Sequence, residues 1–167
     1  MADRKIAYAA DAQLTITLAS LGSSSTLVAG RESTSVDNST NKYLDYELSG
    51  KVTTGTSPTA TRSIEIWVVA PINDTPTWPD VFDGTDSAET VTSRDVLFAC
   101  GKLAKVITTD NTSDRTYPFH VGSVAQLFGG ICPSTFVVFV VHDTAVNLNS
   151  TGSNHEISVK GIYETIA

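Results

Sequence analysis

The amino-acid sequence predicts an all-β domain: an antiparallel, jelly-roll-like β-sandwich of about eight strands with at most one or two short helices. Three observations support this prediction. Apolar and polar residues alternate over many short segments, polar turns separate these segments, and no long segment has a helical period. Ser and Thr are also abundant, and the β-branched Thr fits a pleated, half-buried surface.

The first half of the chain predicts four strands around one polar loop. Apolar residues at every second position indicate a half-buried strand over 14–18, and a short strand is expected over 26–29. Residues 31–42 are polar, which favours an exposed loop. Alternating residues follow over 43–54 and again over 63–70, where Pro71 ends the strand because proline cannot donate to a ladder.

The second half begins with a long irregular stretch, 71–94, of a length that is usually functional or mobile in a compact domain. The apolar segment 96–108, interrupted at Gly101, indicates a strand with a bend, with a short helix over 95–104 as the alternative. Ser123 and the glycines at 129–130 are typical of the start and end of a short helix over 123–128. Further strands are expected over 117–121, 135–142 and 156–166. The segment 135–142 is apolar on both faces, as in a central strand.

A length of 167 residues suits one core, and no repeat or linker divides the chain. We therefore expect an N-terminal arm over 1–12 and a single sandwich domain over 13–167. Ile6 and Tyr8 are the only large apolar residues of the arm. It is either a frayed end or a segment that adds to the sheet edge of a neighbour, and the second reading makes Ile6 and Tyr8 partner-binding residues.

The net charge is −7 and the isoelectric point is about 4.7, with Lys and Arg scattered along the chain. This balance disfavours direct binding to nucleic acid or to an anionic membrane, because both require clustered cations. The sequence shows neither a signal peptide nor an apolar stretch long enough to span a membrane. We therefore expect synthesis in a cytoplasm without export through a cleaved signal.

Reactive side chains form no recognisable catalytic pattern. Cys100 and Cys132 lie in apolar surroundings typical of buried small hydrophobes, and their spacing leaves a disulfide open. No cysteine or histidine spacing indicates zinc. The histidines 120, 142 and 155 are interpreted as strand-end and loop residues, because no GxSxG nucleophile motif accompanies them. The sequence therefore predicts no enzyme, no catalytic residue and no cofactor.

The irregular stretch contains two features that could bind a ligand or a partner. Asp80, Asp83 and Asp86 could hold calcium, although their spacing departs from known calcium loops and a solvated loop is the favoured reading. Trp78 either packs against the sandwich or anchors a partner. Trp67, in the middle of a strand, is expected in the core.

Four segments together resemble small virion proteins of tailed bacteriophages, namely capsid decoration or cement proteins. They are AGRESTSVDN at 29–38, DYELSGKVTTGTSPTATRSIEIWVVAP at 45–71, SVAQLFGG at 123–130 and FVVFVVHDTAVNLN at 136–149. The resemblance implies a β-sandwich on the capsid exterior, with the major capsid protein as partner, a homotrimer as the oligomer and no enzymatic activity. It transfers no individual site residue.

Two other classes of binding protein stay open. The first is another virion component, such as a tail-tube or head–tail joining subunit. The second is a carbohydrate-binding jelly-roll module, for which Trp78 with Asp80 and Asp83 is the cluster that the sequence offers.

Overall fold

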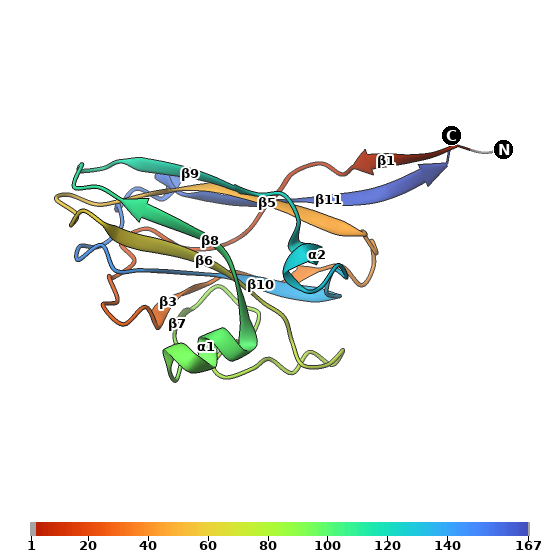
Figure 1. Ribbon diagram of the computed structural model, residues 1–167, viewed down its shortest axis with the longest axis horizontal. Helices are drawn as coiled ribbons and strands as arrows, with labels where there is room; N and C mark the ends of the chain where they lie inside the picture. Colours follow the sequence, from red (N-terminus) through yellow and green to blue (C-terminus); the bar gives the residue numbers. More distant parts are fainter. Residues whose placement is uncertain (1–2, 167) are drawn as a thin grey trace.

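The computed structural model describes residues 3–166, which form two antiparallel β-sheets stacked face to face (Figure 1). The terminal sheet is built from β1 (Arg4–Tyr8), β2 (Ala12–Gln13), β11 (Glu156–Ile166), β5 (Asp45–Thr53) and β9 (Thr116–Val121). The central sheet has the spatial order β7 (Ala88–Thr90), β3 (Ala29–Glu32), β10 (Thr135–His142), β6 (Arg62–Val69) and β8 (Gly101–Thr109), and β4 (Val36–Asp37) pairs with β10. The predicted all-β sandwich is confirmed.

The helical elements are short. They are α1 (Arg94–Cys100), α2 (Val124–Leu127) and a 3₁₀ turn, Gly152–Asn154. The side chain of Ser93 begins α1 by accepting from the Val96 amide, and Ser123 begins α2 by accepting from the Gln126 amide. The glycines 129 and 130 follow α2 with positive φ angles, as the sequence predicts for its end.

The main core lies between the two sheets. It contains Leu48 and Val52 of β5, Ile157 of β11, and alternate residues of the facing strands β6 and β10. Since side chains of a strand point alternately to opposite faces, only half of β10 enters this core. The buried residues that face it from β10 are Phe136, Val138 and Val140.

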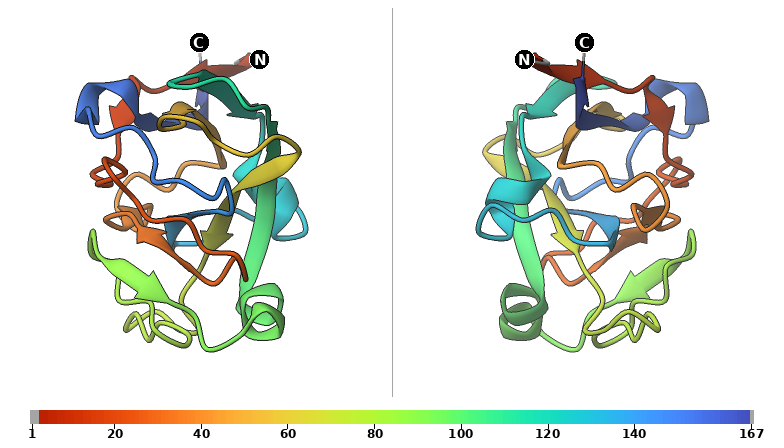
Figure 2. Two further views of the ribbon diagram at one scale, coloured as in Figure 1. Left: turned by 90° about the vertical axis from the view of Figure 1, so that its left-hand side faces the viewer. Right: turned by 90° about the vertical axis from the view of Figure 1, so that its right-hand side faces the viewer.

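The other face of the central sheet is covered by a third layer, formed by residues 70–87 and α1 and visible beneath the sheets in Figure 2. We call it the covering layer. A second hydrophobic cluster lies beneath it and contains Trp67, Val69, Phe82, Val91, Leu97, Val137, Phe139 and Val141. This layer explains why β10 is apolar on both faces, as expected of a central strand.

The longer predicted strands match closely in both halves of the chain. β10 and β11 have the predicted bounds, and β5, β6 and β9 differ by at most two residues at either end. The segment 96–108 contains both alternatives in succession, because α1 ends where β8 begins.

Three predictions for the first half were wrong. Residues 14–18 alternate in burial but form no ladder. Instead, the segment passes from β11, where the Leu14 amide donates to Ile157 (2.8 Å), toward the central sheet, where the Thr15 carbonyl accepts from the Thr34 amide (2.9 Å). The strand expected over 26–29 lies at 29–32 as β3.

The loop expected to be exposed over 31–42 is partly buried. Glu32 and Ser33 are both inaccessible to solvent, and β4 adds a further short strand. The Ser33 hydroxyl accepts from the Val138 amide (3.0 Å), and the Ser33 amide donates to the Val138 carbonyl (2.9 Å). Polar residues thus occupy an interior position here because they satisfy the backbone of β10.

Candidate functional site

The two ends of the described chain form a ribbon that projects from the sandwich (Figure 1). β1 pairs antiparallel with β11 from Arg4 opposite Ile166 to Tyr8 opposite Ile162. β5 pairs with β11 only as far as Ile162, so the ribbon beyond that point has two strands. Of the predicted arm, residues 1–2 lie outside the described part of the chain, whereas Arg4–Tyr8 is not a frayed end but a strand that pairs with its own chain. Its addition to a neighbour stays a prediction.

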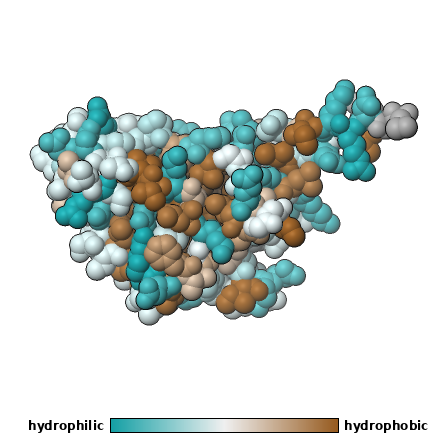
Figure 3. Space-filling view, in the orientation of Figure 1, coloured by the Kyte–Doolittle hydropathy of each residue, from teal (hydrophilic) through white to brown (hydrophobic). Residues whose placement is uncertain are grey.

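One face of this terminal ribbon exposes several large apolar side chains around one ion pair. Residues opposite each other in an antiparallel pair share a face, so Arg4, Ile6 and Tyr8 lie beside Ile166, Glu164 and Ile162. Ile6 is 59% exposed, Tyr8 56% and Ile166 74%. Figure 3 shows apolar side chains continuing from the body along the base of the ribbon.

The two charged side chains on this face pair with each other. Arg4 donates to the Glu164 carboxylate at 3.2 Å across the two strands. An isolated two-stranded ribbon is at best marginally stable in water, and an exposed strand edge is a template for further pairing. The terminal ribbon is therefore a surface that a partner could cover with both apolar contacts and backbone hydrogen bonds.

Trp78 lies in the covering layer and packs against the second hydrophobic cluster with part of its ring exposed. Gly84, with φ +85°, approaches this ring closely, since a Cβ on Gly84 would lie 3.1 Å from it. Of the two readings of Trp78, the structure favours packing against the domain. Trp67 is fully buried on the same side of the central sheet, in edge contact with Phe98.

The three aspartates of the irregular stretch do not converge. Asp80 accepts from the amide and hydroxyl of Thr92, and Asp83 accepts from the amide and hydroxyl of Thr85. Asp86 accepts from Arg31 and Thr17, and these bonds hold the pKa of its carboxyl below the ordinary value despite burial. Within residues 3–166, no three His, Cys, Asp or Glu side chains are grouped to hold a metal ion. The geometry thus gives no support to the calcium hypothesis.

Two glutamates from the central sheet point into the covering layer. Glu65 of β6 accepts from Arg94 of α1 (2.6 Å) and from the Trp67 indole (2.8 Å). Glu32 of β3 accepts from the backbone amides of Gly84 (2.7 Å) and Asp83 (3.2 Å). Sequence reasoning missed both, because an isolated Glu in a strand carries no mark of burial.

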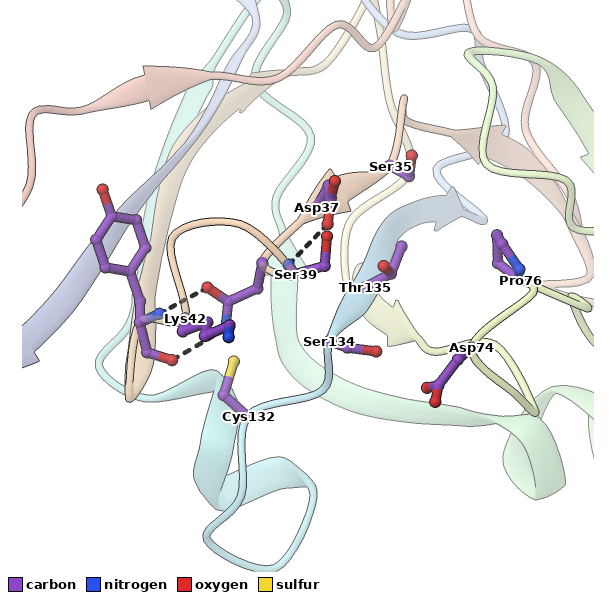
Figure 4. Close-up of a pocket in the computed structure, with 11 residues that line it drawn as sticks. Ser35, Asp37, Ser39, Lys42, Asp74, Pro76, Cys132, Ser134 and Thr135 are labelled. Carbon is purple, nitrogen blue, oxygen red and sulfur yellow. Dashed lines mark hydrogen bonds between the residues drawn. The ribbon is translucent and has the colours of Figure 1, made fainter.

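A shallow cleft of about 660 Å³ opens where β4, the start of β10 and the covering layer meet (Figure 4). Its lining includes the hydroxyls of Ser35, Ser134 and Thr135 together with the charged side chains of Lys42 and Asp74. Asn38 is also in the lining, but its side-chain amide already bonds to the backbone of Tyr43. Its Oδ1 accepts from the Tyr43 amide at 2.8 Å, and its Nδ2 donates to the Tyr43 carbonyl at 2.9 Å. The sequence did not reveal this cleft, since its residues come from three separate segments.

The buried histidines serve the structure. In the neutral ring, Nε2 of His142 donates to the Leu21 carbonyl (3.0 Å), and Nδ1 lies 2.9 Å from the Thr144 hydroxyl. Nδ1 of His155 accepts from the Thr53 amide (3.3 Å), while its Nε2 donates to the Asn149 carbonyl (2.9 Å). Burial lowers the pKa of both rings, which keeps them neutral at physiological pH.

The two cysteines are free thiols, each partly buried. Burial raises the pKa of Cys132 to about 12 and also raises the pKa of Cys100. Both therefore stay protonated and weakly nucleophilic at neutral pH.

No helix among residues 3–166 is long and apolar enough to cross a membrane. In comparisons with known proteins, no protein-family model matches the chain, and no curated protein shows significant sequence similarity to it.

Proposed function

We propose that this protein is a virion structural protein that binds the outer surface of a bacteriophage capsid and stabilises the shell. Its partner would be the major capsid protein, and it would act as a homotrimer on the capsid exterior. The proposal combines the resemblance of four segments to decoration proteins with one structural observation. That observation is the terminal ribbon, which projects from the sandwich and exposes Ile6, Tyr8 and Ile166 on one face.

The physical argument concerns repeated weak contacts. A protein that decorates a shell binds many equivalent positions, so modest contacts from each copy add up over the assembly. A projecting ribbon reaches a neighbour without requiring the sandwich to deform, and its free edges can donate and accept backbone hydrogen bonds. The acidic body keeps unassembled copies soluble.

Co-sedimentation with bare, expanded capsids tests the proposal. The wild-type protein should pellet with the capsids, and the double variant Ile6→Ser/Tyr8→Ser should bind at least tenfold more weakly. Ile72→Ser is the matched control, because Ile72 is also an exposed apolar residue (73%) but lies in the covering layer. Failure of the wild-type protein to pellet would contradict capsid binding. Equal binding by the double variant would exclude the terminal ribbon as the contact.

A second candidate function, carbohydrate binding, is favoured by the hydroxyl-lined cleft. The donors and acceptors at Lys42, Asp74 and Ser134 suit a polyhydroxylated ligand, and Trp78 is not part of the lining. A glycan array should then give a signal that Asp74→Ala abolishes and Trp78→Ala preserves. An array without any signal would remove this candidate.

A further inference from the structure

Glu32 is a buried carboxylate that holds the long loop of the covering layer on the central sheet. Its side chain is inaccessible to solvent. It accepts from the Gly84 amide at 2.7 Å and from the Asp83 amide at 3.2 Å, and the Glu32 amide donates to the Ser87 carbonyl at 2.9 Å. Glu32 of β3 therefore contacts the loop through both its backbone and its side chain.

Among residues 3–166, no cation pairs with this carboxylate. The neighbouring charged groups are Asp83 in the loop and Glu89 on β7, and both are acidic. Arg31, adjacent on β3, is directed to Asp86, with Nε 2.6 Å from the carboxylate. β10, which pairs with β3, places the uncharged Phe139 opposite Glu32. Glu65, the other buried carboxylate of this layer, does have a cation, Arg94.

The hydrogen bonds from the two backbone amides do not offset the loss of solvation of the ionised Glu32 carboxylate. Burial is the largest influence on the Glu32 carboxyl, and with the repulsion from Asp83 and Glu89 it raises the pKa to about 7. The carboxyl thus changes protonation state close to neutral pH while it is docked. In an undocked loop, water would solvate it and restore the ordinary value of about 4.5.

The contact made by Glu32 positions the rest of the loop. The Gly84 carbonyl accepts from the Ser35 amide at 2.9 Å, and Gly84 lies directly beneath the Trp78 ring. The same loop supplies Asp74 and Pro76 to the lining of the cleft. Release of residues 83–84 would therefore disturb both Trp78 and one wall of the cleft.

We propose that Glu32 is a pH-dependent latch for the loop of residues 70–87, which protonation of the carboxyl tightens and ionisation loosens. The reason is that an ionised Glu32 is better solvated when the loop is undocked, whereas a neutral Glu32 has little to gain from water. The loop docks more firmly as the pH falls from 8 to 5. This latch is independent of the proposed capsid contact, which lies on the terminal ribbon.

Proton linkage sets the size of the effect. A carboxyl that titrates at about 7 when docked and at about 4.5 when undocked changes the docking equilibrium by about 70-fold at most between pH 8 and pH 5. A change of tenfold or more is expected, since partial undocking leaves some burial in place.

Amide hydrogen exchange of Asp83 and Gly84 measures the docking directly, after correction for the intrinsic pH dependence of exchange. Protection at these two amides should rise at least tenfold from pH 8 to pH 5, relative to amides of β5 and β11 in the same sample. Glu32→Gln, which stays neutral, should keep the protection high and nearly constant across this range. Glu89→Gln is the control for a nearby carboxylate. It keeps Glu32 but removes one source of repulsion, so protection should still rise as the pH falls, over a range slightly lower in pH than in the wild-type protein.

A carboxyl ¹³C titration of the wild-type protein and of Glu89→Gln provides the second measurement, which does not depend on the folding of Glu32→Gln. A Glu32 midpoint near 7 supports the latch, and a midpoint near 4.5 overturns it. The proposal also fails if Glu32→Gln folds and retains the wild-type pH dependence of loop protection. In that case a group other than Glu32 would be responsible, and not His142 or His155, whose lowered pKa values make acidification destabilising.

Discussion

At the scale of single residues, the covering layer depends on a few polar contacts within an apolar setting. The guanidinium of Arg94 lies over the ring of Trp67 (5.0 Å to its centroid) and over that of Phe98 (4.8 Å), and it also donates to Glu65 and to the Leu27 carbonyl. One side chain thus fastens α1 to the central sheet by charge, hydrogen bonds and cation–π contact.

Replacing Arg94 by Met should lower the free energy of unfolding by about 3 kcal/mol, because it leaves the Glu65 carboxylate buried without a cation. The measurement is urea unfolding at pH 7. The double variant Arg94→Met/Glu65→Gln should recover part of the loss, since the remaining side chain is neutral. A double variant no more stable than Arg94→Met alone would show that the stacking on Trp67 and Phe98 is the larger contribution.

At the scale of elements, the sequence predicts the long strands well and the short strands poorly. β10 is an almost continuous apolar run over eight residues and β11 alternates apolar and polar residues over most of its eleven, so their bounds follow from the sequence pattern. Residues 14–18 show the same alternation, yet their backbone bonds go to separate segments. One side of the segment 14–18 packs against the domain, which accounts for the alternating pattern, although the segment pairs with no neighbouring strand.

The candidate site was predicted less completely than the fold. Ile6 and Tyr8 were identified because they are large apolar residues in a polar arm, and both are exposed on the terminal ribbon. Ile166 was read only as part of a strand, because its exposure depends on β5 ending opposite Ile162. Glu32 and the cleft depend on contacts between distant segments, which a single sequence does not encode locally.

The terminal ribbon should be dispensable for folding. Its residues 4–7 and 163–166 pair with each other beyond the last pairing of β5. Deleting residues 1–8 should therefore shift the thermal midpoint by only a few degrees, which differential scanning calorimetry can measure. A collapse of the midpoint would show that β1 supports the sandwich and would move the domain boundary from residue 13 to the start of the chain.

At the scale of the whole molecule, two kinds of buried group have opposite effects on the free energy of unfolding as the pH changes. Glu32 has a raised pKa in the folded state, so its contribution to stability is fully present below about 4.5 and is lost as the pH rises through about 7. His142 and His155 have lowered values, so their contribution is present above about 6.5 and is lost as the pH falls. Near pH 6 the two effects partly cancel.

The variant Glu32→Gln should separate the contribution of Glu32 to stability from that of the two histidines. It lacks the gain that Glu32 supplies on acidification, which is about 2 kcal/mol at most between pH 7.5 and pH 5.5. Its free energy of unfolding should therefore fall more steeply than that of the wild-type protein over this interval, as urea titrations at both pH values would show. Asp86, whose pKa is lowered, does not interfere, because its contribution is lost only at more acidic pH. Parallel pH profiles for the two proteins would contradict this account.

Because Arg4 and Ile166 face each other across the terminal ribbon, both ends of the described chain leave the molecule at one tip. A fluorescent protein or affinity tag fused to either terminus would therefore cover the same exposed apolar side chains of the ribbon. Moving the tag from one terminus to the other would not uncover them. The turn over 55–61, between β5 and β6 at the opposite end (Figure 1), is the better insertion point for a label that must leave the tip accessible.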